Sequence, residues 1–152
     1  TNVGLVGETA RREGFNATLS QGDIKNLDFP DNMFDAVVCY SVLEHIDDTD
    51  SAIRELSRVL KPDGTAVVGF PAVNRAMTLL FDLIGLDQQD QKQGLAPFTE
   101  EQHVSGPTQV LHSCQTFMSI ERIRQFPRFI PRAAALYFVC KCTKKTAVQQ
   151  NG

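Results

Sequence analysis

The chain has 152 residues, of which 42% are hydrophobic and 22% charged, and its formal net charge is −3 at pH 7. This length suits a single domain, and the composition is that of a globular chain, which excludes a disordered or low-complexity protein. Because fifteen basic residues face eighteen acidic ones, no strong positive field arises and we expect no nucleic-acid partner. No apolar run approaches the roughly 20 residues that cross a bilayer, so we expect no membrane span.

Four cysteines, Cys39, Cys114, Cys140 and Cys142, are spaced irregularly along the chain. We interpret them as buried or neutral thiols in a reducing compartment, which favours a cytoplasmic protein. One residue separates Cys140 from Cys142, whereas zinc and redox pairs use a spacing of two residues. With only three histidines in the chain, support for a metal centre is weak, and we assign no metal ligand.

The first forty residues are predicted to form one helix and two strands. The helix covers residues 5–13 and ends at Gly14, a residue type that often follows a helix C-terminus. A short strand is expected over 16–20, and a Phe-Pro-Asp-Asn turn follows at 29–32. Residues 34–40 form a near-continuous apolar run rich in valine, which is typical of a strand buried on both faces.

The middle of the chain alternates between helices and strands. Apolar residues recur at three- and four-residue spacing over 49–60, which predicts a helix with one buried face. The Lys-Pro-Asp-Gly sequence at 61–64 is expected to end that helix in a turn whose glycine takes a positive φ. A buried strand follows at 65–70. Residues 74–86 predict a helix with a broad apolar face, and the polar residues 87–99 predict a loop or lid.

The last third is predicted to contain one helix, at 107–116, and two strands, at 118–125 and 134–142. The short link between these strands favours an antiparallel hairpin. Taken with the strand–helix alternation before them, they predict an α/β domain with a largely parallel sheet over residues 1–143. Residues 144–152 are expected to form a polar tail.

Four short blocks of sequence, in their order along the chain, resemble a known protein family. They are Gly22-Asp23-Ile24, residues 27–38, Val42-Leu43-Glu44-His45-Ile46 and residues 54–64. Their order and spacing resemble the class I S-adenosylmethionine-dependent methyltransferases, most closely the small-molecule branch called methyltransferase type 11. The resemblance implies a Rossmann-like sheet with strand order 3-2-1-4-5-7-6, S-adenosyl-L-methionine as cofactor and a small-molecule methyl acceptor as partner.

The resemblance assigns cofactor contacts to five residues. Asp23 falls where the family places an acidic acceptor for the adenine amino group, and the Ile24 backbone lies beside it. Tyr40, Ser41 and Val42 fall where the fourth strand passes the methionine part of the cofactor. Alternatives stay open, because Asp23 also suits a plain turn and Tyr40 a half-buried strand end.

His45 is the candidate catalytic residue, since it lies with Glu44 at the acceptor side of the same turn. An unperturbed histidine has a pKa of roughly 6.5, so its side chain could orient or deprotonate an acceptor. A packing or helix-capping role is the alternative. Because the methyl donor is already activated, most of the acceleration can come from aligning the reactants in a dry pocket, and no fixed triad is expected.

The sequence departs from the family upstream of Gly22. The Gly-rich loop after the family's first strand is not found, nor is the acidic residue after its second strand. Since the sequence also begins at Thr1 rather than Met, we expect these residues to be the C-terminal part of a longer enzyme and to be inactive alone. In that case residues 34–40 would form an open apolar edge.

Two further questions stay open at this point. The surplus apolar residues of 74–86 would suit contact with the missing part, a homodimer partner, or a lid over a lipid, quinone or aromatic metabolite. A non-catalytic relative that keeps the fold as a partner or scaffold subunit is the alternative to an enzyme. A nicotinamide-dependent enzyme lacks support, because no Gly-x-Gly-x-x-Gly follows a strand.

Overall fold

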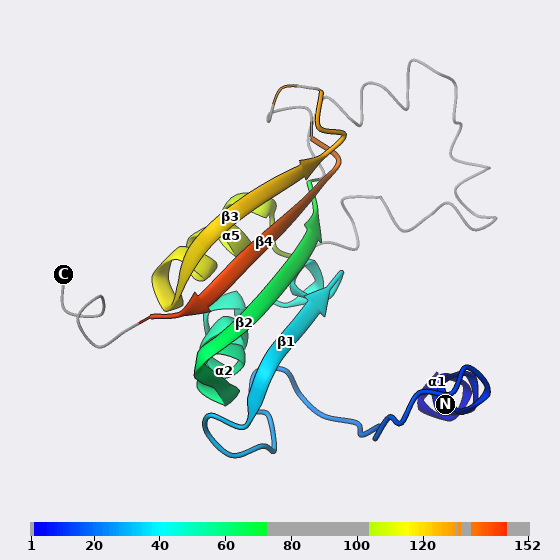
Figure 1. Cartoon of the computed structure of the whole chain (residues 1–152). Coiled ribbons are helices and arrows are strands. Elements are labelled where there is room, and N and C mark those ends of the chain that lie inside the picture. Colours follow the sequence, from blue (N-terminus) through cyan, green and yellow to red (C-terminus); the bar gives the residue numbers. More distant parts are fainter. Residues whose placement is uncertain (1, 73–103, 130, 132–134, 146–152) are drawn as a thin grey trace, which may run out of the picture.

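The computed structural model describes residues 2–72, 104–129, 131 and 135–145, and Figure 1 follows them along the chain. These residues form helix α1 (Asn2–Arg12), strand β1 (Phe34–Tyr40), the 3-10 turn η1 (Leu43–His45), helix α2 (Thr49–Val59), strand β2 (Leu60–Pro71), helix α5 (Pro107–Phe117), strand β3 (Met118–Phe126) and strand β4 (Tyr137–Lys144). The helix expected at 74–86, the loop expected at 87–99 and most of the expected tail lie outside the described residues.

The four strands form one sheet in the order β1-β2-β4-β3 (Figure 1). Strands β1 and β2 are parallel, whereas β4 runs antiparallel to both of its neighbours, β2 and β3. This arrangement is the 4-5-7-6 half of the strand order that the resemblance implies, and it confirms the expected antiparallel hairpin. The sheet of the described residues is nevertheless mixed rather than largely parallel, because β4 contributes two antiparallel pairings.

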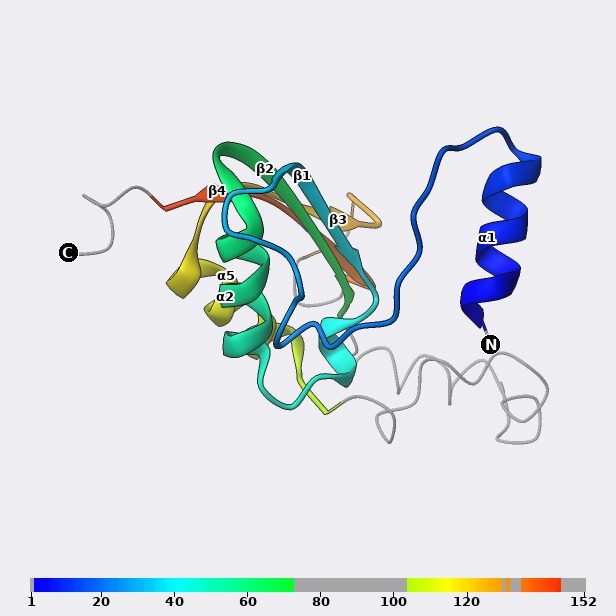
Figure 2. The same cartoon turned by 90° about the horizontal axis from the view of Figure 1, so that it is seen from below.

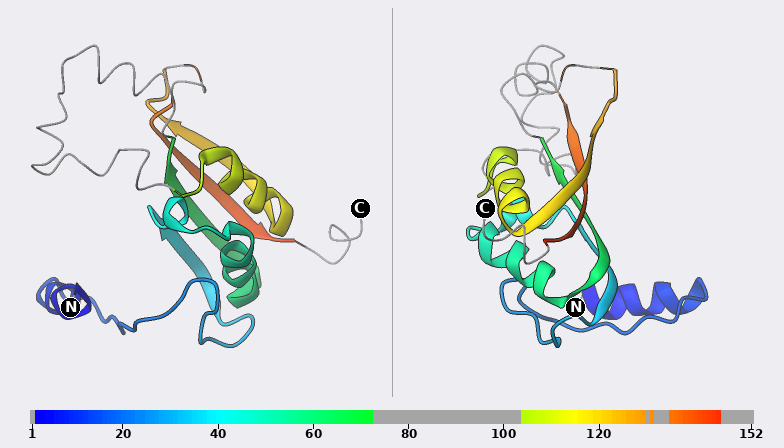
Figure 3. Two further views of the ribbon diagram at one scale, coloured as in Figure 1. Left: turned by 180° about the vertical axis from the view of Figure 1, so that it is seen from behind. Right: turned by 60° about the vertical axis from the view of Figure 1, so that its left-hand side comes forward.

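Helices α2 and α5 cover the same face of the sheet, as Figure 2 and Figure 3 show. Asp48 precedes helix α2 and caps it, because its carboxylate accepts a hydrogen bond of 3.0 Å from the Ser51 N–H. Its repeating apolar residues point to the sheet, as their periodicity predicts. The buried residues between these helices and the sheet include Ile53, Leu56, Val68, Phe70, Val110 and Cys140. Helix α1 stands away from this core at the end of an extended segment (Figure 2).

Most of the elements expected from the sequence are confirmed to within a few residues. Helices α1, α2 and α5 and strands β1, β3 and β4 lie where periodicity placed them, and Gly14 takes a positive φ of 77° after α1. The four cysteines are all buried, as expected. Burial raises the pKa of the Cys39 thiol to about 11, with a smaller contribution from the charge of Glu44, so this thiol stays protonated at neutral pH.

The short strand expected at residues 16–20 is wrong. These residues have no regular structure and their side chains are exposed. A strand gains its stability from hydrogen bonds to a neighbouring strand and from a covered face. No strand of the described sheet pairs with residues 16–20, and the sheet covers no face of this segment.

Strand β1 lies where it was predicted, but the prediction that both of its faces are buried is wrong. Cys39 is buried on the helix side, whereas Val38 on the other face is 64% exposed. Two features explain this. Strand β1 is an edge strand of the described sheet, and both α2 and α5 lie on the opposite face from Val38.

The Lys-Pro-Asp-Gly sequence also differs from expectation, because it forms the first part of β2 rather than a separate turn. Gly64 does not take a positive φ. Glycine is needed at this position because there is no room for a side chain. A Cβ atom on residue 64 would lie 2.7 Å from the Leu60 side chain and 3.0 Å from the carbonyl oxygen of Asp35. Glycine at this position therefore allows β1 and β2 to approach each other closely.

Candidate active site

Three strand ends meet at one edge of the sheet. Tyr40, the last residue of β1, pairs with Gly69 of β2, and Pro71 at the end of β2 pairs with Tyr137 at the start of β4. The Ser41 N–H donates a hydrogen bond of 2.9 Å to the Gly69 carbonyl oxygen, and η1 follows directly. The carboxyl ends of parallel strands are the usual ligand-binding edge of an open α/β sheet.

Two tyrosine rings cover Gly69 at this edge. The rings of Tyr40 and Tyr137 are stacked, with their centroids 6.4 Å apart and an interplanar angle of 15°. A Cβ atom on Gly69 would overlap the Tyr40 ring and lie 3.0 Å from the Tyr137 ring. Glycine therefore makes the space that lets the two rings come together, while Tyr40 stays 46% exposed.

Ser41 links the two strands that carry these rings. Its φ is +50°, a left-handed conformation that is uncommon for a residue other than glycine and that concentrates at functional sites. The Oγ atom of Ser41 and the hydroxyl of Tyr137 share a hydrogen bond of 3.0 Å. Burial is the main cause of a raised Tyr137 pKa, which this hydrogen bond partly offsets and the charge of Glu44 increases.

Glu44 is the residue of this site that departs most from its usual environment. It is 3% exposed, and its Oε2 atom has no hydrogen-bond partner within the described part of the chain. Its carbonyl oxygen accepts hydrogen bonds of 2.8 Å from the Val104 N–H and 3.1 Å from the Ser105 N–H. The segment before α5 is therefore joined to η1 through the Glu44 backbone.

His45, the catalytic candidate from the sequence, is far more exposed than Glu44. Its side chain is 47% exposed, and its Nε2 atom lies 4.0 Å from Oε1 of Glu44. That separation is too long for a hydrogen bond. An exposed imidazole beside a buried carboxylate can meet an acceptor that approaches from solvent.

The structure also brings the Asp23 turn to this edge. Lys25 forms an ion pair of 3.2 Å with Asp47, which directly follows η1 and Ile46. Asp23 is exposed, and its Oδ1 accepts a hydrogen bond of 2.9 Å from the Lys25 N–H. Its turn role is therefore present, and its other oxygen has no partner in the described residues. Ile24 packs partly buried against the core.

Val42 completes the residues expected from the sequence. It is partly exposed, and its carbonyl oxygen accepts a hydrogen bond of 3.0 Å from the His45 N–H, which closes η1. Tyr40, Ser41 and Val42 thus lie together, whereas Asp23 and Ile24 approach from the neighbouring turn. Tyr137 was missed, because it is brought in by an antiparallel strand 96 residues away from Ser41 and no motif marks it. The burial of Glu44 was missed as well.

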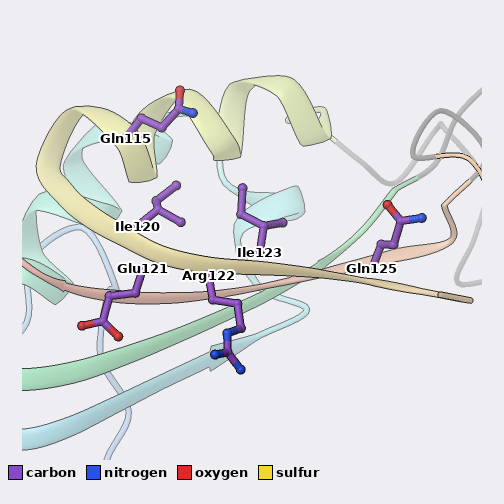
Figure 4. A pocket seen from close by; sticks show the side chains of 6 residues that line it. All are labelled: Gln115, Ile120, Glu121, Arg122, Ile123 and Gln125. Atoms are coloured by element: carbon purple, nitrogen blue, oxygen red, sulfur yellow. The ribbon is translucent and has the colours of Figure 1, made fainter.

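A surface hollow of about 510 Å³ lies elsewhere, along β3 (Figure 4). It is lined by Gln115, Ile120, Glu121, Arg122, Ile123 and Gln125, and β3 is the edge of the sheet opposite to β1. None of the residues expected to bind cofactor lines it.

Within the described residues, no group of three or more histidine, cysteine, aspartate or glutamate side chains could hold a metal ion. Likewise, none of the helices described is long and apolar enough to cross a membrane.

Comparison with known sequences shows which proteins this part of the chain resembles. Residues 2–68 match the family model described as a methyltransferase domain. A sterol 24-C-methyltransferase of Gibberella zeae is 36% identical over 89 residues, which are 57% of this chain and 22% of that protein. A demethylmenaquinone methyltransferase of Staphylococcus carnosus is 44% identical over 66 residues, which are 43% of this chain and 27% of that protein. The chain therefore covers well under a third of the length of these curated relatives.

Solved structures share the fold at low sequence identity. The cyclase SpnF has a TM-score of 0.67 at 20% identity, over 95% of this chain and 63% of that one. A geranyl diphosphate methyltransferase in complex with S-adenosylmethionine has a TM-score of 0.66 at 12% identity, over 94% and 64%. At such identities the likeness shows the fold alone. The sequence match over residues 2–68 makes this part of the chain similar to a methyltransferase domain, and the described residues share their fold with solved methyltransferases.

Proposed function

We propose that this chain takes part in S-adenosylmethionine-dependent methyl transfer to a small-molecule acceptor. The observation that carries the proposal is the arrangement at the ends of β1 and β2. There the Asp23 turn, the left-handed Ser41 and η1 lie together, and all of them fall within the residues that match the methyltransferase domain. Fold alone would not support a reaction, because one fold hosts many chemistries.

The residues present fit the cofactor that the family uses. We assign the adenine amino group to the exposed carboxylate of Asp23 and to the backbone at Ile24, and the methionine end to Tyr40, Ser41 and Val42. When bound, S-adenosylmethionine supplies a methyl group that is already activated on a positively charged sulfur. The unpartnered oxygen of the buried Glu44 carboxylate suits a site that receives positive charge.

The chain's own residues would then orient the acceptor and exclude water. His45 is the group that can hold or accept a proton at its Nε2 atom, because it is half exposed at the mouth of the site. The tyrosine pair forms an apolar wall beside it. Alignment of the reactants against this wall would provide most of the acceleration.

An apolar small molecule is the acceptor we propose. Exposed apolar side chains surround the site: Val38, Tyr40, Val42 and Val104. The relatives named above act, by their names, on a sterol and on demethylmenaquinone. The described residues near the site offer no basic cluster that would neutralise phosphates, which argues against nucleic acid.

We also propose that these residues function as part of a longer enzyme. Strand β1 is the outer strand of the described sheet, and its exposed Val38 face suits a covering segment. The small share of the relatives' lengths that is matched supports the same proposal. The alternative is a non-catalytic partner or scaffold subunit with this fold.

Two measurements test the proposed function. Isothermal titration of the full-length protein with S-adenosylhomocysteine should show binding, and no binding would favour the non-catalytic alternative. Incubation with methyl-labelled S-adenosylmethionine should transfer label into extracted small molecules. Label found in nucleic acid or protein alone would contradict a small-molecule acceptor.

A further inference from the structure

In the described part of the chain, no lysine or arginine side chain forms an ion pair with the Glu44 carboxylate. Its one ion-pair contact there is the 4.0 Å approach of His45 to Oε1, and Oε2 has no partner. Lys25, the basic residue of the neighbouring turn, is engaged elsewhere, since it pairs with Asp47. A buried carboxylate is costly unless a positive charge or hydrogen-bond donors meet it.

The charge of this carboxylate acts on Tyr137, one member of the tyrosine pair. Glu44 contributes, after burial, to the raised pKa of Tyr137 and of Cys39, so its field extends to both side chains. The Tyr137 hydroxyl also shares a hydrogen bond with the Ser41 side chain. Ser41 lies two residues before Leu43, where η1 begins. The Glu44 carboxylate and the two stacked tyrosine rings therefore lie in one small region, at the end of β1 and the start of β4.

Aromatic faces and a buried carboxylate attract the same kind of ligand. The face of a tyrosine ring is electronegative and draws cations, and this attraction grows when water is excluded. The stacked Tyr40 ring is half exposed, so a ligand can reach it. A neutral ligand would leave the charge of Glu44 without compensation, whereas a cation would relieve its burial cost.

We propose that Glu44 and the Tyr40–Tyr137 pair select for a positively charged ligand at the ends of β1 and β4. The ligand charge is the sulfonium of the methyl donor, so this inference rests on the proposed function. It assigns to Glu44 a role in distinguishing the cationic donor from the neutral product. Residues that merely shape the pocket would affect both ligands equally.

The test compares two cofactor analogues that differ in charge at the same position. Sinefungin carries an amine, and is cationic, where S-adenosylhomocysteine has a neutral sulfur. We define the selectivity as the Kd of S-adenosylhomocysteine divided by the Kd of sinefungin, both measured by titration on the full-length protein. Glu44→Gln keeps the size of the side chain and removes its charge. It should lower the selectivity by about tenfold and change the Kd of S-adenosylhomocysteine by less than about threefold.

Matched variants separate this effect from general disturbance. Asp47→Asn removes the same formal charge three residues away, but from a solvated side chain, and should leave the selectivity unchanged. Tyr40→Leu removes the aromatic face and should lower the selectivity by about threefold, whereas Tyr40→Phe should retain it. Because Tyr40 is half exposed, these two variants test the proposal even if Glu44→Gln fails to fold.

The outcomes distinguish the inference from the function on which it rests. Unchanged selectivity in Glu44→Gln, or an equal loss of both ligands, would overturn the role of Glu44 and leave the proposed function intact. A loss of turnover with unchanged selectivity would assign Glu44 to the acceptor instead and would also overturn the inference. Binding of neither analogue by the wild-type protein would overturn the proposed function itself.

Discussion

Ser41 and Tyr137 lie 96 residues apart in the sequence, yet Oγ of the first and the hydroxyl of the second share a hydrogen bond of 3.0 Å. This bond joins the end of β1 to the start of β4 across the end of β2, since Tyr40 pairs with Gly69 and Pro71 pairs with Tyr137. The C-terminal hairpin, through Tyr137, thus helps to hold Ser41 in its left-handed backbone conformation. The last strands of the chain thereby shape the region expected to bind the cofactor.

Tyr137→Phe should weaken this link. The change removes the hydroxyl and leaves the ring, so Ser41 loses a partner while the stacking with Tyr40 remains. We expect the free energy of unfolding to fall by about 1 kcal/mol, the usual net value of one hydrogen bond. Urea denaturation of both proteins measures this. Tyr40→Phe, which removes a hydroxyl with no described partner, should change stability by less than about 0.5 kcal/mol.

Gly69→Ala should disrupt the tyrosine pair. The added Cβ would overlap the Tyr40 ring and press on the Tyr137 ring, so at least one ring has to move. We expect a loss of about 1–3 kcal/mol in the free energy of unfolding, as for other overpacked sites. Gly22→Ala is the matched control, because nothing lies within 4 Å of a Cβ there. Similar losses in both variants would contradict the role of Gly69 as the space beneath the rings.

Glu55 gives the fold a pH dependence. Its carboxylate binds the Arg58 guanidinium at 2.8 Å and accepts a hydrogen bond of 2.9 Å from the Leu27 N–H, so it fixes the segment that leads from the Asp23 turn into β1. The hydrogen bond from Arg58 is the main cause that holds the pKa of Glu55 below its ordinary value. A lowered pKa in the folded state means that the ionised form stabilises the fold. This contribution is complete above the ordinary pKa of roughly 4.3 and is lost as the pH falls through the folded value.

Glu55→Gln should therefore remove part of the acid sensitivity. At pH 7 we expect the variant to be less stable by about 1–2 kcal/mol, because charge-assisted hydrogen bonds are lost. Below pH 4 the difference between the two proteins should shrink, since the wild-type carboxylate becomes protonated. Urea denaturation at several pH values measures both. A difference that stays constant down to pH 3 would contradict the assignment.

Periodicity and turn residues were sufficient to place most elements of the fold. The apolar repeat in α2 and the valine-rich run of β1 predict their structures because local pattern and tertiary environment agree. Residues 16–20 have a strand-like alternation too, but no neighbouring strand pairs with them. Pairing is a property of the whole sheet, so a single segment does not reveal it.

The candidate site was predictable only where it is local in sequence. The block from Tyr40 to His45 is continuous, and its resemblance to a family drew attention to it. The contribution of Tyr137 depends on the register between β2 and β4, and the surroundings of Glu44 include Val104 and Ser105, whose N–H groups bind its carbonyl oxygen. Both are long-range consequences of packing, which residue identity alone does not encode at either position.

Asp23→Ala provides the most direct test of the cofactor assignment. If the free oxygen of this carboxylate accepts a hydrogen bond from the adenine amino group, its loss should weaken binding of S-adenosylhomocysteine by about 1–3 kcal/mol, as for bonds to charged groups. Part of the loss could come from the turn, because Oδ1 also accepts the Lys25 N–H. Asp23→Asn separates the two effects, since its amide oxygen can still serve the turn while the charge is gone. Asp28→Ala removes an exposed carboxylate five residues further along the same segment and should leave binding unchanged. Titration of the full-length variants measures all three, and unchanged affinity in Asp23→Ala would reduce Asp23 to a turn residue.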